Sequence, residues 1–184
     1  MLVLGVARGG VPVAAEIASE FVCQLDVAVA RKIGAPANPE FAIGAVAAGG
    51  EPIINEAVIR AYRISKSYVD DAVAVARREV ERRTDRYREG RAAANPAGRV
   101  VIVADDGVAT GSTLIAVLRA VRAQSPLSII CAVPVGPADT IALLENEADN
   151  VICPLQPEGF MAVGTWFDDF AQLSDDEVVR LLRA

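Results

Sequence analysis

The stretch VVIVADDGVATGST, residues 100–113, joins an apolar run to two adjacent carboxylates and then to a loop of small and hydroxyl residues. The apolar run predicts a buried strand, and a helix is expected to begin at about Ser112. Gly107 and Gly111 let the intervening backbone curl tightly, so that successive N–H groups can point inward. Because a helix N-terminus also carries a partial positive charge, the stretch predicts a strand–loop–helix unit whose loop binds an anion.

The loop is suited to one phosphate group rather than to a chain of them. The hydroxyls of Thr110, Ser112 and Thr113 add hydrogen-bond donors to those of the backbone. The Walker A pattern GxxxxGK[ST] occurs nowhere in the chain, and no lysine lies in this loop to reach a second phosphate. A monophosphate is therefore the predicted ligand of the loop.

Asp105 and Asp106 precede the loop, at the predicted edge of the sheet. Neighbouring side chains of a strand point in different directions, so this pair is poorly placed to clamp one metal ion. The two carboxylates could instead accept hydrogen bonds from the vicinal hydroxyls of a ribose, which with the loop describes a ribose 5-phosphate site. Walker B segments and receiver domains also end a strand in acidic residues, and Asp106 could simply cap a turn. The first alternative lacks its Walker A partner here, and the second carries its acidic pair near the chain start.

The rest of the chain alternates strand and helix patterns. Residues 2–6 and 25–30 predict strands on either side of a helix that begins near Pro12, an arrangement that makes the two strands parallel. Further strands are predicted at 99–104, 127–133 and 150–153, with helices at 112–124 and 137–147. The expected fold is α/β, an open and mostly parallel sheet with helices on both faces, in a single domain of residues 1–184.

Two segments lie outside this alternation. Residues 34–97 predict a small inserted cap, with a hairpin at Gly49-Gly50 and helices at 56–62 and 65–91. Residues 155–184 predict a tail that packs near the site and ends in a helix, with Ser174 and Glu177 as a capping box. A cap of this kind could close over a bound acceptor and exclude water, as mobile lids do.

Composition removes several classes of function. The net charge of −6 argues against a general nucleic-acid binder, which needs a basic surface. The chain has no histidine, which excludes Ser-His-Asp and Cys-His nucleophilic sites. The cysteines are odd in number and form no CxxC pair, so buried free thiols are expected at Cys23, Cys131 and Cys153. The start MLVLGVARGG is a poor signal peptide and no apolar run could span a bilayer, so a cytoplasmic location without membrane contact is the expectation.

The motif VVIVADDGVATGST resembles the phosphoribosyl pyrophosphate (PRPP) motif of type I phosphoribosyltransferases. The strings ARGGVPVA, ARKIGAPANPEFAIGAVA and GTWFDDF are similar to those of an uncharacterised subgroup of that family, so the resemblance covers nearly the whole chain. It implies that Asp105 and Asp106 bind the ribose hydroxyls of PRPP. It also implies a loop around the 5-phosphate, made of Gly107, Val108, Ala109, Thr110, Gly111, Ser112 and Thr113.

The resemblance also assigns the pyrophosphate of PRPP to the turn Ala7-Arg8-Gly9-Gly10. In the family this turn sometimes contains a cis peptide that does not involve proline, and Arg8 can offer phosphate oxygens a planar fork of donors. Arg31 and Lys32 follow the second predicted strand at the same edge of the sheet. Either could be a solvated strand end, and Lys32 is favoured over Arg31 as a further cation facing the pyrophosphate.

The tail is similar to that of purine phosphoribosyltransferases once one residue is shifted. The similarity implies that Phe160 or Trp166 stacks on the base and that Asp168 lies near the pyrophosphate. The alternative is that these aromatic residues pack the tail onto the core. Members of the subgroup carry a helix before the first strand, and we expect that a chain without it would expose apolar surface, which favours association.

The reaction implied is transfer of the 5-phosphoribosyl group from PRPP to a nitrogenous base, with Mg²⁺ bound by the substrate rather than by a site of the protein alone. Ala109 stands where some purine-specific relatives carry an acidic general base, which leaves Asp105 or Asp106 for that role. A homodimer is the expected assembly. A PRPP- or nucleotide-binding sensor without catalysis stays open, as does a hydrolytic or phosphorylase-like activity on a ribose phosphate.

Overall fold

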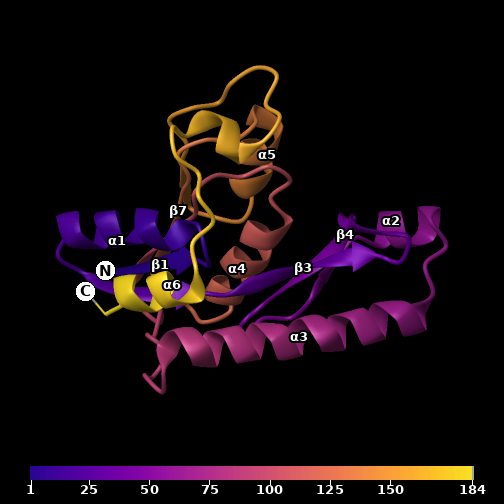
Figure 1. The fold of residues 1–184 in the computed structure, drawn as a ribbon, viewed down its shortest axis with the longest axis horizontal. Coiled ribbons are helices and arrows are strands. Elements are labelled where there is room, and N and C mark those ends of the chain that lie inside the picture. The colour runs from indigo at the N-terminus through magenta and orange to yellow at the C-terminus, as the bar shows by residue number, and fades with distance from the viewer. Residues whose placement is uncertain (184) are drawn as a thin grey trace.

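A computed structural model describes residues 1–183, apart from the side chain of Glu40. Its main sheet is entirely parallel and has the strand order β2-β1-β6-β7-β8. The strands are β1 (Leu2–Val6), β2 (Gln24–Ala28), β6 (Val100–Ala104), β7 (Ser128–Ala132) and β8 (Asn150–Ile152). The predicted α/β sheet with helices on both faces is thereby confirmed (Figure 1).

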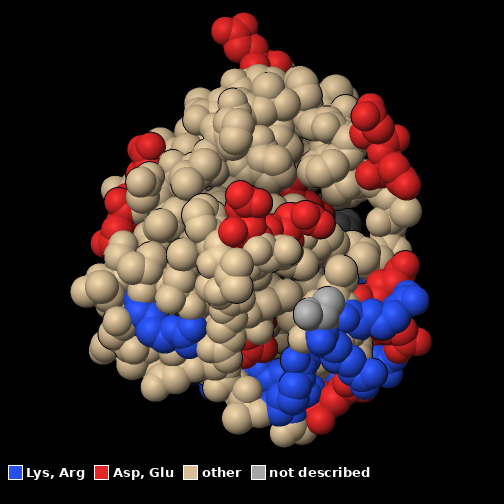
Figure 2. Space-filling model, turned by 90° about the vertical axis from the view of Figure 1, so that its left-hand side faces the viewer, with Lys and Arg blue, Asp and Glu red and all other residues tan. Residues whose placement is uncertain are grey.

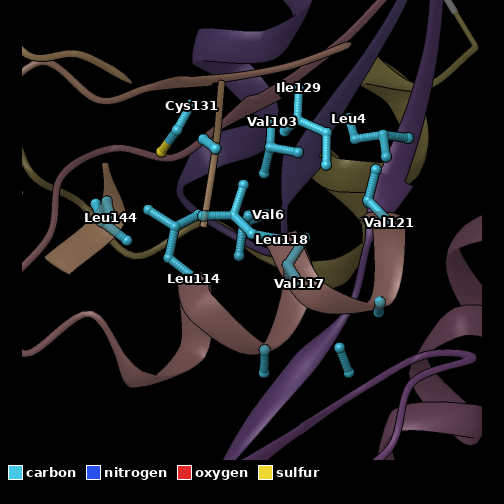
Figure 3. Packing of buried hydrophobic residues seen from close by; sticks show 14 of the residues in the cluster. Leu4, Val6, Val103, Leu114, Val117, Leu118, Val121, Ile129, Cys131 and Leu144 are labelled. Carbon is cyan, nitrogen blue, oxygen red and sulfur yellow. The ribbon is translucent and has the colours of Figure 1, made fainter. Parts of the chain in front are cut away.

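The two faces of the main sheet are covered by different helices. Val3 and Ile102 pack with α1 (Gly10–Glu20) on one face, and Leu4 and Val103 pack with α4 (Ser112–Arg122) on the other. Since side chains alternate along a strand, an apolar run such as VVIVA serves both layers at once. Figure 3 shows the second layer, in which Leu4, Val103 and Ile129 lie over the apolar side of α4.

A second, antiparallel sheet has the order β3-β4-β5 and extends away from the first along a long helix (Figure 1). It contains β3 (Ala30–Ala35), β4 (Asn38–Ala47) and β5 (Ile53–Ile54), followed by α2 (Glu56–Ala61) and α3 (Lys66–Arg88). The Tyr68 hydroxyl donates a hydrogen bond to the Gly34 carbonyl at 2.9 Å, which joins α3 to β3.

The boundary between the two sheets differs from the prediction. One strand over residues 25–30 was expected, but β2 ends at Ala28 and the chain enters β3 at Ala30. The predicted start of the cap at residue 34 therefore falls inside β3, and Arg31 and Lys32 lie within that strand instead of after β2. The run LDVAVARKI carries no glycine or proline between the two strands, so nothing in its local pattern marks the change of sheet.

The C-terminal part consists of α5 (Ala138–Leu144), the 3₁₀ turn η1 (Val163–Trp166) and α6 (Asp175–Leu181). The capping box of Ser174 and Glu177 is present at the start of α6. Val178 and Val179 of α6 are buried in a cluster with Val11 and Tyr87, and the Tyr87 hydroxyl donates to Asp175 at 2.7 Å. The tail is thereby fixed to both α1 and α3.

Most charges of α3 are paired, with one another, with α6, or with Glu51 and Asp26. Glu79 accepts from Arg82 and Arg83 at 2.8 and 2.7 Å, and Arg86 donates to Asp176 at 2.7 Å. Figure 2 shows basic and acidic side chains intermingled at the lower right of the face that it draws, while separate acidic patches lie at its centre and edges. The helix therefore carries a solvated face on which opposite charges are interspersed.

The three cysteines are free, and only one of them is fully buried. Burial raises the pKa of the Cys131 thiol to about 12, whereas Cys23 and Cys153 are half-buried. The prediction of buried thiols is therefore right for Cys131 and wrong for the other two. Among the described residues, no helix is both long enough and apolar enough to cross a membrane.

Candidate active site

Two loops meet at the carboxyl ends of the adjacent strands β1 and β6. A Cβ atom added at Gly9 would lie 1.7 Å from a carboxylate oxygen of Asp106, and one added at Gly10 would lie 2.5 Å from the Ala104 carbonyl. Only glycine permits this approach of the first loop to the second. The peptide between Ala7 and Arg8 is cis. The structure thus brings the predicted pyrophosphate turn directly against the predicted ribose-binding pair.

Asp105 and Asp106 lie together at this junction, both half-buried. The Asp106 N–H donates to the Asp105 carboxylate at 2.9 Å. Burial raises the pKa of Asp105 well above its ordinary value, and the neighbouring charge of Asp106 raises it further. Burial also raises the pKa of Asp106. A ligand that donates hydrogen bonds to these carboxylates, or brings a cation, would offset the cost of ionising them.

The segment after the acidic pair leads into α4 and is held in place by its neighbours. The Val108 N–H donates to the Val135 carbonyl at 2.9 Å, and the Thr140 hydroxyl donates to the Ala109 carbonyl at 2.7 Å. Gly111 precedes the helix with φ of 77°, a left-handed conformation that other residues adopt only with strain. These contacts fix the loop without using the N–H groups of residues 109–113.

The backbone donors of this loop are left for a ligand. Within the described part of the chain, no protein group accepts a hydrogen bond from the N–H groups of residues 109–113. Ala109 and Thr110 are exposed, so this part of the loop is open to solvent. An array of N–H groups at the start of an eleven-residue helix has the geometry that can bind a phosphate or carboxylate.

A cavity of about 550 Å³ adjoins the junction of the loops. Arg8, Gly9 and Asp106 line one side of it, and the tail lines the other with Phe167, Asp169 and Phe170. The two phenylalanine rings lie 5.2 Å apart between centroids, at an interplanar angle of 38°. The tail therefore folds over the turn that contains Arg8.

The tail residues that line this cavity are sequence neighbours of the ones predicted to contact the base and the pyrophosphate. Phe160, Trp166 and Asp168 do not line this cavity, whereas Phe167 and Asp169 do. Beyond Asp169 the lining continues without interruption through residues 170–173, so no alternation along WFDDF marks these residues in the sequence. A similarity that required a one-residue shift could not fix which residue of each adjacent pair faces the cavity.

Comparisons with known proteins agree with this geometry. The sequence model of the phosphoribosyl transferase domain family matches residues 1–163. The chain belongs to the type I phosphoribosyltransferase family. The crystal structure of TT1426 from Thermus thermophilus is similar to this chain, with a TM-score of 0.82 and 40% identity over 98% of this chain and 86% of that one. The predicted family and fold are thereby confirmed.

Two curated phosphoribosyltransferase relatives come from Mycobacterium tuberculosis. Each carries the name "putative phosphoribosyl transferase" and is 41% identical over 182 residues, which is 99% of this chain. The match covers 41% of each relative, so the chain spans about two fifths of their length.

Arg31 and Lys32 occupy opposite faces of the second sheet of this family member. Lys32 pairs with Ala45 and Arg31 with Val46, and partners in an antiparallel pair share a face. Ala45 packs in the cluster that contains α4, whereas Val46 packs in the one that contains α3. Lys32 therefore lies on the face toward α4, the helix that begins at the predicted phosphate-binding loop, and Arg31 lies on the face toward α3. Neither residue lines the cavity beside Arg8.

Proposed function

We propose that this chain transfers the 5-phosphoribosyl group of PRPP to a nitrogenous acceptor and releases pyrophosphate. The observation that carries the proposal is the contact of Gly9 with Asp106. This contact places three groups next to one another along one edge of the sheet. They are the turn that carries a cation, the pair of carboxylates and the helix N-terminus. A pyrophosphate, a ribose diol and a 5-phosphate are the three groups of PRPP that such a series would bind.

The 5-phosphate would accept hydrogen bonds from the N–H groups of residues 109–113 and from the hydroxyls of Thr110, Ser112 and Thr113. The carboxylates of Asp105 and Asp106 would accept from the ribose hydroxyls. Because both ends of the sugar are then fixed, its C1 atom is held in one place relative to the acceptor. The raised pKa values of both carboxyls support this role, since donors from the substrate stabilise the ionised form.

The pyrophosphate would lie toward Arg8, whose guanidinium can bind its oxygens bidentately. Among the residues that line this cavity, Asp106 and Asp169 are acidic and Arg8 is the cation, so the protein alone leaves much of the pyrophosphate charge uncompensated. We assign the remainder to Mg²⁺, which favours carboxylate and phosphate oxygens. Lys32, which lies on the face of the second sheet toward α4, is a further candidate for compensating the pyrophosphate charge.

The residues present fit a cation that arrives with the substrate. Within the described residues, no group of three or more acidic, cysteine or histidine side chains is arranged to hold a metal ion. Asp106 and Asp169 face the same cavity and could complete the coordination of an ion held by PRPP. When bound, the ion would neutralise charge that develops on the departing pyrophosphate.

No protein nucleophile is needed. The bond from C1 to the pyrophosphate oxygen breaks, a bond from C1 to the acceptor nitrogen forms, and the acceptor loses one proton. Burial raises the pKa of both carboxyls, so either carboxylate of the pair could accept this proton. Choice of acceptor would be made by the cap and the tail, and the tail reaches the site through Val163, which lies against Gly107.

The test is an assay of pyrophosphate release with PRPP, Mg²⁺ and a panel of purines, pyrimidines and nicotinate. Release that depends on one acceptor supports the transferase. PRPP binding by calorimetry without turnover on any acceptor would favour the sensor, and release without an acceptor would favour hydrolysis. An unchanged PRPP affinity in Asp105→Asn/Asp106→Asn would contradict the site itself.

A further inference from the structure

The exposed part of the predicted phosphate loop, Ala109 and Thr110, is held by one side chain of the neighbouring helix α5. The Thr140 hydroxyl donates to the Ala109 carbonyl at 2.7 Å. Among the described residues this is the only hydrogen bond from a side chain to residues 107–113. Thr140 itself is buried, with 7% of its surface exposed. A buried group of the protein thus reaches into an exposed loop.

Thr140 directs its hydroxyl away from its own helix. It is the third residue of α5, and a helical threonine commonly donates to a carbonyl three or four residues earlier in the same helix. Thr84 shows this local arrangement, because its hydroxyl donates to the Val80 carbonyl at 2.7 Å. The bond from Thr140 has the same length but spans 31 residues of sequence. It is therefore a tertiary contact made to the loop.

The bond fixes the orientation of one peptide group. The Ala109 carbonyl and the Thr110 N–H belong to the same trans peptide, in which the C=O and N–H bonds point in opposite directions. Since the carbonyl is turned toward α5, the N–H is turned away from that helix. Within the described part of the chain no protein group accepts a hydrogen bond from this N–H, and Thr110 is exposed. The donor is thus presented on the open side of the loop.

The methyl group of Thr140 lies beside the next turn of the loop. A Cβ atom added at Gly111 would lie 3.1 Å from Cγ2 of Thr140. The two branches of this side chain therefore meet the loop on both sides of Thr110, the hydroxyl at Ala109 and the methyl group at Gly111. The contact of the hydroxyl can be removed separately from that of the methyl group.

We propose that Thr140 is a positioning residue for a bound phosphate monoester, an inference that rests on the phosphate site of the proposed function. It orients the Thr110 N–H toward the phosphate without touching the ligand. A hydrogen bond to a peptide carbonyl also polarises that peptide, which strengthens donation by its N–H. The effect belongs to the 5-phosphate alone, because pyrophosphate is assigned to the turn that contains Arg8.

Two variants divide the side chain into its parts. Thr140→Val removes the hydroxyl and keeps the shape, whereas Thr140→Ser keeps the hydroxyl and removes the methyl group. In calorimetry with ribose 5-phosphate, Thr140→Val should raise Kd about tenfold, as expected for one lost hydrogen bond to a charged group, and Thr140→Ser should stay within about threefold of wild type. Both variants should bind pyrophosphate with Mg²⁺ as the wild type does. Thr84→Val, which removes a threonine-to-carbonyl bond of equal length on α3, is the matched control and should bind both ligands normally.

A merely structural role predicts other results. Loss of affinity for pyrophosphate to the same extent, or equal losses in Thr140→Val and Thr140→Ser, would overturn the proposal. So would an unchanged Kd of ribose 5-phosphate in Thr140→Val. A wild type that binds neither ligand would instead refute the proposed function on which the inference rests.

The orientation of the peptide can be followed without any ligand. ¹⁵N relaxation dispersion reports exchange between orientations on the microsecond-to-millisecond timescale. We expect such exchange at the Thr110 N–H in Thr140→Val and none in the wild type or in Thr140→Ser. A Thr110 N–H without exchange in Thr140→Val would refute the inference whatever the wild type binds, which separates its failure from that of the proposed function.

Discussion

The loop of residues 105–113 and the tail of residues 166–173 border the same site, but they are specified in different ways. The loop lies between a strand and a helix, so each of its residues inherits a position from regular structure. The tail has only one short 3₁₀ turn and is placed by packing of Phe167 and Phe170 against each other. A residue between regular elements can be assigned from its spacing, whereas a residue of the tail can be displaced by one position without breaking any local rule.

The strongest test of this contrast is at the acidic pair. Asp105→Asn/Asp106→Asn should lower the rate of pyrophosphate release by about 10²–10³-fold, the usual loss when a preorganised electrostatic contact is removed. Circular dichroism should show an unchanged fold, because the neutral amides are nearly isosteric with the acids. An activity within threefold of wild type would place the chemistry elsewhere.

The next largest effect is expected at the contact between the loops. Gly9→Ala would bring a methyl group to within 1.7 Å of the Asp106 carboxylate, so one loop must move. We expect PRPP affinity to fall by about tenfold or more, since misplacement by about 1 Å can cost up to 10²-fold. Gly159→Ala is the comparison: it also lies in a loop, at φ of 69°, but its Cβ would meet nothing within 4 Å. Affinity should be retained there, and equal losses in the two variants would contradict a specific role for the contact.

The tail gives a smaller and more discriminating test. Asp169→Asn should weaken Mg²⁺-dependent PRPP binding about tenfold, because Asp169 faces the cavity beside Arg8. Asp168→Asn changes the adjacent carboxylate, which does not line that cavity, and should have little effect. Titration of Mg²⁺ against PRPP binding by calorimetry separates the two. The reverse order of effects would support the phase expected from the sequence.

The same contrast explains which parts of the structure could be predicted. The strand, acidic pair and phosphate loop follow from apolar periodicity and from two glycines, so the order of residues 100–113 determines their placement. The change from β2 to β3 at Val29 could not be predicted in this way, because the strand pattern continues across it. Only the pairing of β3 with Ala47 and Val46 shows that the chain has entered another sheet. The approach of Gly9 to Asp106 could not be predicted either, since it joins segments almost a hundred residues apart. What could not be predicted is long-range packing in each case.

The smallest expected effect concerns the stability of the ligand-free protein and its dependence on pH. Asp105 has a pKa raised above its ordinary value by burial, so its protonated form is favoured in the folded state. The stabilisation is present at pH values below the ordinary pKa and is lost as the pH rises through the raised one.

Asp105→Asn removes this loss of stability at higher pH. At neutral pH it should therefore increase the free energy of unfolding by about 1 kcal/mol, or Tm by about 2–4 °C. The gain should vanish near pH 4, where the wild-type carboxyl is protonated in the folded protein.

Saturating PRPP and Mg²⁺ should make the wild type more stable than the variant at neutral pH, because only the wild-type carboxylate accepts hydrogen bonds from the ligand. Melting curves at several pH values, with and without PRPP, measure both effects. A variant less stable than wild type at neutral pH without ligand would show that Asp105 is a structural residue, and the contrast with the tail would then lose its functional meaning.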